Sequence, residues 1–155
     1  MLKFVMNIAR NKKAFHNYDI LEEYETGIVL AGTEVKSVRA GHINLKEAHI
    51  KIINGEAFLI NCHIAPYEQG NINNHDPVRS RKLLLRRREL NSLAGKVKEQ
   101  GLTLVPLKVY IKNRRIKVGM GLAKGKKLYD KRRSLKDKDM QRDVERAFRG
   151  SKKMF

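Results

Sequence analysis

Hydrophobic and polar residues alternate along several short stretches of the chain, which is the pattern of half-buried β-strands. In residues 49–60, two alternating runs flank Asn54-Gly55, the preferred two-residue turn of a β-hairpin. Residues 103–122 repeat the pattern and predict a second hairpin. Residues 18–31 predict a further strand, in which Gly27 indicates a bulge or a sharp bend.

Two stretches have the spacing of helices instead. Residues 32–41 fit one or two helical turns, with Thr33 as the cap and Gly41 as the stop. In residues 82–100, apolar residues recur every three to four positions, and Gly101 closes the helix. Short strands, tight turns and few helices together predict a mainly β fold, an OB-like antiparallel β-barrel whose closure removes exposed sheet edges.

The distribution of charge along the 155 residues indicates how the chain is divided into segments. The formal net charge is +18, and residues 124–155 carry +8 of it in a run where like charges crowd. Residues 7–17 are polar and basic, and we predict a basic N-terminal extension at 1–15 followed by a barrel domain at 16–123. We predict that the cationic C-terminal tail (124–155) is disordered alone and folds on a partner. Apolar residues at helical spacing predict a helix at 134–150 within that tail.

No catalytic set stands out in the sequence. The five histidines lack metal-ligand spacing with cysteine or carboxylate partners, and neither a P-loop nor a carboxylate pair for acid–base chemistry is found. Residues 74–77 (Asn-His-Asp-Pro) fit a turn better than a site. Cys62 lies in an apolar stretch and fits a small buried side chain, and a single free thiol fits a reducing cytoplasm. We expect no enzyme, no metal or other cofactor and no membrane partner.

The basic clusters indicate an RNA partner. Arg79, Arg81, Lys82 and the triplet at 86–88 surround a leucine run, and such cations neutralise phosphates. Recognition of folded RNA also needs acceptors and stacking groups. Glu25 and Glu34 could accept hydrogen bonds from 2′-hydroxyl or guanine donors, and aromatic or imidazole rings could stack on bases, the candidates being His16, Tyr67 and Tyr129. For each of these residues taken singly, a purely structural role fits the spacing better.

Four segments, in order along the chain, resemble the small protein B (SmpB) family, the transfer-messenger-RNA-binding proteins of bacterial trans-translation. They are residues 11–18 (NKKAFHNY), 32–37 (GTEVKS), 79–85 (RSRKLLL) and 121–132 (GLAKGKKLYDKR). The resemblance runs from about residue 8 to residue 150. It implies an OB-like barrel that holds the tRNA-like domain of transfer-messenger RNA (tmRNA) and brings this RNA to stalled ribosomes in the cytoplasm.

The resemblance also implies residue roles and partners. The implied RNA-binding residues are Asn11, His16, Glu25, Glu34, Lys36, Leu84, Arg86, Lys117 and Lys124. The implied tail residues at the ribosomal decoding centre are Lys126, Lys127, Tyr129, Asp130, Lys131 and Arg132. Beyond these, the tail would lie as a helix in the empty mRNA channel, against small-subunit RNA. Elongation factor Tu is a further expected partner within the delivered complex.

Three other interpretations of the sequence stay open at this point. A general basic ribosome-associated RNA-binding barrel would share the charge but not the specificity for one RNA. An RNA-processing enzyme would need a site that the motifs do not reveal. A membrane-active tail would bind anionic lipid without RNA.

Overall fold

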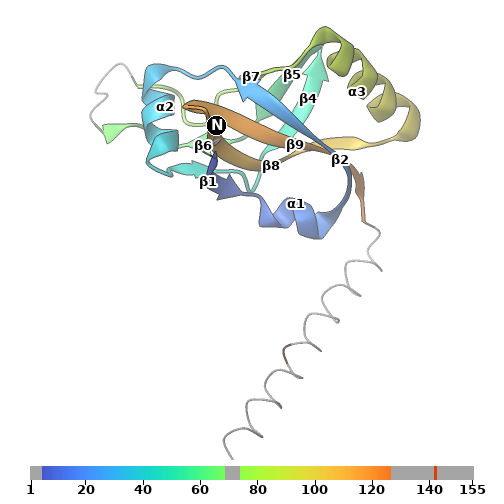
Figure 1. Ribbon diagram of the computed structural model, residues 1–155, viewed down its shortest axis with the longest axis horizontal. Helices are drawn as coiled ribbons and strands as arrows, with labels where there is room; N and C mark the ends of the chain where they lie inside the picture. Colours follow the sequence, from blue (N-terminus) through green and yellow to red (C-terminus); the bar gives the residue numbers. More distant parts are fainter. Residues whose placement is uncertain (1–4, 69–73, 127–141, 143–155) are drawn as a thin grey trace, which may run out of the picture. The chain divides into compact units, whose positions relative to one another are not determined.

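The computed structural model describes residues 5–68, 74–126 and 142. The chain forms two units, residues 1–125 and 126–155, and the described residues lie almost wholly in the first. The first unit contains three helices and nine strands in its described part (Figure 1). The helices are α1 (Lys12–Asn17), α2 (Gly32–Arg39) and α3 (Arg87–Gln100). The strands are β1 (Val5–Arg10), β2 (Tyr18–Ile28), β3 (Ile43–Asn44), β4 (His49–Ile53), β5 (Glu56–Ile60), β6 (His63–Ile64), β7 (Arg81–Leu84), β8 (Thr103–Lys112) and β9 (Arg115–Gly125).

The main sheet is antiparallel throughout and closes into a ring. Its strands follow the order β1-β8-β4-β5-β7-β2-β9, and β9 also pairs with β8, which completes the circle. β1 extends the sheet along the second half of β8, and β3 and β6 form a separate two-stranded ladder. The prediction of a mainly β fold with a few helices is therefore confirmed.

Both predicted hairpins are present, and both have two-residue turns with positive φ angles. The turn between β4 and β5 has Asn54 at φ 51° and Gly55 at φ 76°. The turn between β8 and β9 has Asn113 at φ 51° and Arg114 at φ 65°. Such left-handed pairs match the right-handed twist of the flanking strands, and glycine tolerates the second position best. The second turn therefore holds an arginine where glycine is the favoured residue.

The core lies inside the ring, where side chains from alternate strand positions meet. Its buried members from β5, β7, β8 and β9 include Leu59, Leu83, Val109, Met120 and Leu122. α3 contributes Leu90 and Leu93 to the core from one of its faces, and α2 contributes Val38. The two helices lie at opposite ends of the ring (Figure 1). α3 ends at Gly101 with φ 62°, as the sequence predicts.

Two predicted elements differ from the structure. Residues 7–17, expected to be an extension, instead form most of β1 and all of α1, because β1 finds its hydrogen-bonding partner about 100 residues later in β8. The helix predicted at 82–100 begins only at Arg87, because residues 81–84 form β7. A run of leucines fits either period, and the neighbouring strands β5 and β2 decide for the strand.

Two local predictions are also wrong. The N-cap of α2 is Ala31 rather than Thr33, and the backbone N–H of Ala31 donates to the Glu34 carboxylate at 2.9 Å. β2 has its irregularity between Ile20 and Glu22, whereas Gly27 is paired regularly with β7 and β9. Gly27 is small for a packing reason, since a Cβ there would lie 3.2 Å from Cβ of Leu84.

No helix in the described part of the chain has the length and apolar character to cross a membrane. The predicted helix at 134–150 lies outside the described residues except for Arg142. Lys127, Tyr129, Asp130, Lys131 and Arg132 also lie outside them, so the proposed roles of these tail residues stay predictions.

Candidate nucleic-acid interface

Five cations from three elements and one turn gather around the β8–β9 hairpin tip, and we call them the turn cluster. They are Arg39 at the end of α2, Lys112 in β8, Arg114 in the turn, and Arg115 and Lys117 in β9. Arg115 and Lys117 line two adjoining hollows of about 290 and 400 Å³. The Arg39 guanidinium donates to the carbonyl of Arg114 at 3.3 Å, which joins α2 to the turn. The turn cluster is therefore a concave cationic surface suited to phosphates.

Glu25 is the acidic member of this surface. Its carboxylate accepts a hydrogen bond from the hydroxyl of Tyr110 at 2.7 Å and lies 3.2 Å from the ammonium of Lys112. The hydrogen bond from Tyr110 is the main reason that the pKa of Glu25 is lowered, and the cations Lys112 and Lys117 act in the same direction. Glu25 thus stays ionised and presents an acceptor among donors.

Leu84 supplies an apolar component beside the cations. It is 51% exposed, and it lines the smaller hollow together with Arg39 and Lys117. Val29, also exposed, follows β2, and its N–H donates to the carbonyl of Lys82, two residues before Leu84. An exposed leucine beside a cationic hollow can contact the face of a base while the cations bind the backbone.

Glu25, Leu84 and Lys117 are thus the predicted RNA-binding residues that the fold brings together. Others lie elsewhere on the first unit. His16 is half-buried in the last turn of α1, and Lys124 is exposed near the end of β9. Arg86 is exposed immediately before α3, where its backbone forms the N-cap.

Asn11 has a structural role that the sequence did not predict. It is 5% exposed, its side-chain oxygen accepts from the N–H of Ala14, and its amide donates to the carbonyl of Pro106 at 2.9 Å. Its backbone N–H donates to Leu107. Asn11 therefore caps α1 and ties it to β8.

Glu34 is also buried, at the centre of an ion-pair network. Its two oxygens accept from the guanidinium groups of Arg79 and Arg81, and Arg81 is itself fully buried. Burial raises the pKa of Glu34, but hydrogen bonds from Ala31, Arg79 and Arg81 outweigh burial, so the pKa is lowered overall. Glu34 has no exposed surface to offer to RNA.

The same network corrects the prediction that Arg79 and Arg81 belong to an exposed basic cluster. Arg81 also donates to the carbonyls of Cys62, Asp76 and Pro77, so all of its contacts are internal. Lys82 is partly exposed and pairs with Glu56 at 3.0 Å, and residues 86–88 are exposed. Only part of the sequence cluster is therefore open to phosphates.

Cys62 matches its prediction, and the turn predicted at 74–77 lies slightly later in the chain, from Asp76 to Arg79. Cys62 is fully buried, and burial raises the pKa of its thiol to about 11. The carboxylate of Asp76 accepts from the N–H of Val78 as a turn begins. The His75 ring bridges the Thr33 hydroxyl and the carbonyl of Ile64, each at 2.9 Å. Within the described ranges, acidic, histidine and cysteine side chains do not gather into a group that could hold a metal ion.

Aromatic rings pair with cations at two further places. Lys36, a predicted RNA-binding residue on α2, lies 5.2 Å from the ring centroid of Tyr67. Arg10 lies 4.6 Å from the ring of Phe15 on α1. Both aromatic residues are half-buried, and in each pair the cation lies over the ring.

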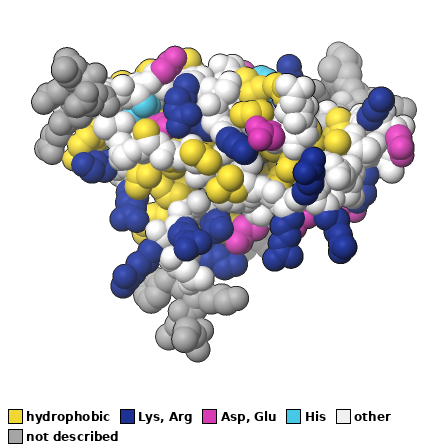
Figure 2. Space-filling view, turned by 90° about the horizontal axis from the view of Figure 1, so that it is seen from above, with side chains coloured by type: hydrophobic (Ala, Val, Ile, Leu, Met, Phe, Trp, Pro, Cys, Tyr) yellow, Lys and Arg dark blue, Asp and Glu magenta, His cyan; other side chains and the backbone are white. Residues whose placement is uncertain are grey.

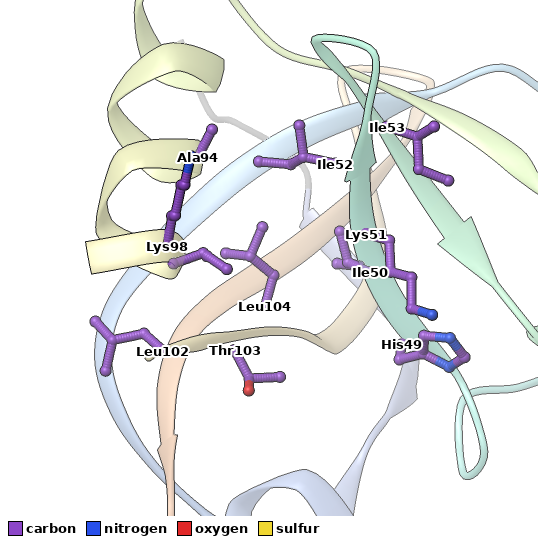
Figure 3. A pocket seen from close by; sticks show the side chains of 11 residues that line it. His49, Ile50, Lys51, Ile52, Ile53, Ala94, Lys98, Leu102, Thr103 and Leu104 are labelled. Atoms are coloured by element: carbon purple, nitrogen blue, oxygen red, sulfur yellow. The ribbon is translucent and has the colours of Figure 1, made fainter. Parts of the chain in front are cut away.

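A cavity of about 470 Å³ lies apart from the turn cluster, between β4, α3 and the start of β8. Ile52 and Leu104 project into the gap between the helix and β4 in Figure 3. β4 and β8 pair only at Ile50 and Leu104, so few backbone hydrogen bonds close the ring between these two strands. None of the predicted RNA-binding residues lines this cavity.

Most residues of the turn cluster were not predicted from the sequence to bind RNA. Lys112, Arg114 and Arg115 surround a predicted hairpin turn, so their charge density was a usable signal. Arg39 could not be found in this way, because only the tertiary fold brings the end of α2 to the β8–β9 turn.

On the face that Figure 2 shows, Lys and Arg side chains surround exposed apolar side chains and outnumber acidic ones. An antiparallel β ring with a concave cationic surface, an exposed leucine and one fixed carboxylate defines a small basic protein suited to binding a structured nucleic acid.

The chain belongs to the SmpB protein family, whose model matches residues 8–150. It is 62% identical to an SsrA-binding protein of Geobacillus sp. (strain WCH70) over 147 residues, which cover 95% of each chain. It is 61% identical to an SsrA-binding protein of Bacillus subtilis (strain 168), over 96% of this chain and 95% of the relative. A solved structure described as "tmRNA-SmpB: a journey to the center of the bacterial ribosome" matches with a TM-score of 0.65 and 52% identity, over 79% of this chain and 86% of that one.

Proposed function

We propose that this protein binds the tRNA-like domain of tmRNA and delivers the RNA to stalled ribosomes for trans-translation and ribosome rescue. The observation that carries the proposal is the identity of 61–62% to SsrA-binding proteins across nearly the whole of both chains. The description of the matching structure, which names tmRNA, SmpB and the bacterial ribosome, points to the same partners. The protein acts by holding RNA and has no catalytic machinery of its own.

The turn cluster is the surface that we assign to tmRNA. Its cations neutralise backbone phosphates and release counterions, so binding weakens as salt concentration rises. Leu84 contacts the face of a base, and Glu25 accepts from an uncharged RNA donor. The antiparallel ring, which we regard as an OB-like barrel, holds these groups in fixed positions.

Asn11 and Glu34 act differently from what the family resemblance implies. Both are buried and fully engaged in internal hydrogen bonds. Their substitution would destabilise α1 or the base of α2 and would remove no RNA contact. His16, Lys36, Arg86 and Lys124 extend the RNA-binding surface around the first unit.

The cationic segment at 124–155 serves the ribosome in this proposal. Its residues Lys126 to Arg132 approach the decoding centre, and the rest becomes helical in an mRNA channel that no message occupies. A channel lined by RNA suits a basic segment that folds only there. Elongation factor Tu travels with the delivered complex, and the whole cycle takes place in the cytoplasm.

The direct test is peptide tagging on a message without a stop codon, reconstituted with and without this protein. The full chain should restore tagging, and the chain ended after Gly125, at the end of β9, should bind tmRNA but fail to tag. Simultaneous alanine substitution of Asp130, Lys131 and Arg132 should have the same effect. If this triple change abolishes tmRNA binding, or if the shortened chain tags normally, the separation of the two surfaces is wrong.

A general basic RNA-binding protein is the second candidate, because cations from many elements allow the surface to bind any polyanion nonspecifically. Competition at physiological salt separates the two. Unlabelled tmRNA should displace labelled tmRNA at concentrations at which bulk ribosomal RNA does not. Equal displacement by both would favour the general binder.

A further inference from the structure

Tyr110 holds the Glu25 carboxylate in one orientation. Tyr110 is 6% exposed, and its hydroxyl donates to Oε2 of Glu25 at 2.7 Å. The Lys112 ammonium lies 3.2 Å from the same oxygen and 3.5 Å from Oε1. Oε2 is thus fully engaged, whereas Oε1 has one long contact and keeps accepting capacity on a side chain that is 40% exposed.

The two side chains meet across the intervening strand β9, on which Gly119 leaves room for the stem of Lys108. Glu25 on β2 pairs with Gly119 on β9, and Gly119 pairs with Lys108 on β8. A Cβ at Gly119 would lie 2.8 Å from Cγ of Lys108, so the lysine stem occupies the space that a side chain would take. The Lys108 ammonium lies 5.4 Å from the centre of the Tyr110 ring and helps to fix it.

Five cations around one carboxylate would ordinarily make this surface accept phosphate everywhere. A fixed carboxylate prevents phosphate binding at its own position, because it repels a phosphate and accepts a hydrogen bond from an uncharged donor. RNA offers such donors in its 2′-hydroxyl groups and in the exocyclic amino groups of unpaired bases. A freely rotating carboxylate would instead fold onto the neighbouring lysines.

We propose that Tyr110 is a positioning residue for RNA recognition, which fixes Glu25 so that its Oε1 accepts a hydrogen bond from an uncharged RNA donor within the cationic surface. This inference rests on the proposed function, because it assigns the chemistry of one point on that RNA-binding surface. Tyr110 itself touches no RNA in this arrangement.

The test uses Tyr110→Phe in the full-length chain, because phenylalanine keeps the ring packing and removes only the hydroxyl. Its tmRNA affinity should fall about tenfold, which is the lower end of the effect of losing one hydrogen bond to a charged group. Tyr24→Phe is the matched control, since the Tyr24 hydroxyl donates to Glu22 beside Lys96 in a similar arrangement away from the turn cluster. That variant should bind tmRNA as the original protein does.

Two readouts separate positioning from loss of fold. In Tyr110→Phe the pKa of Glu25 loses its main lowering influence and rises, so RNA affinity should begin to fall at a higher pH on acidification. In the Glu25→Gln background, Tyr110→Phe should cause little further loss. Additive losses, or an unshifted pH profile, would overturn the proposal.

The donor is identified by changing the RNA. Single 2′-deoxy substitutions test the hydroxyl, and inosine in place of guanosine tests the amino group. One of these should weaken the original protein and leave Glu25→Gln unaffected, and equal effects on both proteins would overturn the proposal. If the original protein binds tmRNA no better than bulk RNA, the proposed function fails. If it prefers tmRNA and Tyr110→Phe matches it, only the present inference fails.

Discussion

Replacing Glu34 by glutamine should destabilise the first unit strongly, because the change leaves the fully buried Arg81 cation without its counter-charge. The side chains of Glu34 and Arg81 are both fully buried and hydrogen-bonded to each other. Removing one partner of a buried pair typically costs about 3–5 kcal/mol. Glutamine keeps an oxygen that can accept from arginine, so we expect about 3 kcal/mol. At about 3–4 °C per kcal/mol for a chain of this size, the melting temperature should fall by about 10 °C.

The assay is equilibrium unfolding in guanidinium chloride together with thermal melting. Glu56→Gln is the matched control, since Glu56 pairs with Lys82 at 3.0 Å on the surface and both side chains are more than 40% exposed. A surface pair contributes under about 1 kcal/mol, so the control should melt close to the original protein. Below the melting range, Glu34→Gln should keep tmRNA affinity within about twofold.

The effect should also depend on pH in a defined direction. The pKa of Glu34 is lowered in the folded protein, so its stabilisation is present above the unfolded value of about 4.3 and is lost as the pH falls through the folded value. The difference between Glu34→Gln and the original protein should therefore shrink below about pH 4. If Glu34→Gln melts like Glu56→Gln but loses RNA affinity, Glu34 is an RNA contact and the structural argument is wrong.

Three further predictions concern single residues. Leu84→Asn should weaken tmRNA binding in a filter assay by about tenfold, which corresponds to the loss of one base contact. Leu21→Asn, at a similarly exposed leucine on β2, should not weaken it, and equal losses in the two variants would contradict the role of Leu84. Cys62 should react with a thiol reagent at pH 8 about 100-fold more slowly in the folded protein than in denaturant, because it is buried and its thiol pKa is about 11; equal rates would refute the burial. Gly121→Ala should lower the free energy of unfolding by about 1–3 kcal/mol, because the new Cβ would lie 2.9 Å from a methyl of buried Leu107; an unchanged denaturation midpoint would show that the core yields.

Local sequence signals predicted the parts of the fold that local chemistry decides. Asn54-Gly55 fixes a two-residue turn, and Gly101 ends α3, because their backbone angles favour these residues. The alternation in β8 and β9 gave the second hairpin for the same reason. β1 was not predicted, because six residues of mixed polarity show no clear strand pattern and form a strand only by pairing with β8.

The candidate site shows the same limit. Lys117 and Leu84 were named through the family resemblance, and the fold places both beside one hollow. Arg81 was misread as a surface cation, since its partner Glu34 lies 47 residues away in sequence. Charge along a sequence cannot distinguish an arginine that faces solvent from one that neutralises a distant buried carboxylate.

The arginine at the tip of the β8–β9 hairpin shows that this sequence is not the most stable one for its backbone. Arg114 adopts a φ of 65° that glycine would adopt without strain, at a penalty of about 1–2 kcal/mol for a residue with a Cβ. The β4–β5 hairpin uses glycine at the equivalent place. The same turn geometry therefore occurs twice in the molecule, once with glycine and once with an arginine that adds a cation to the turn cluster at a conformational cost.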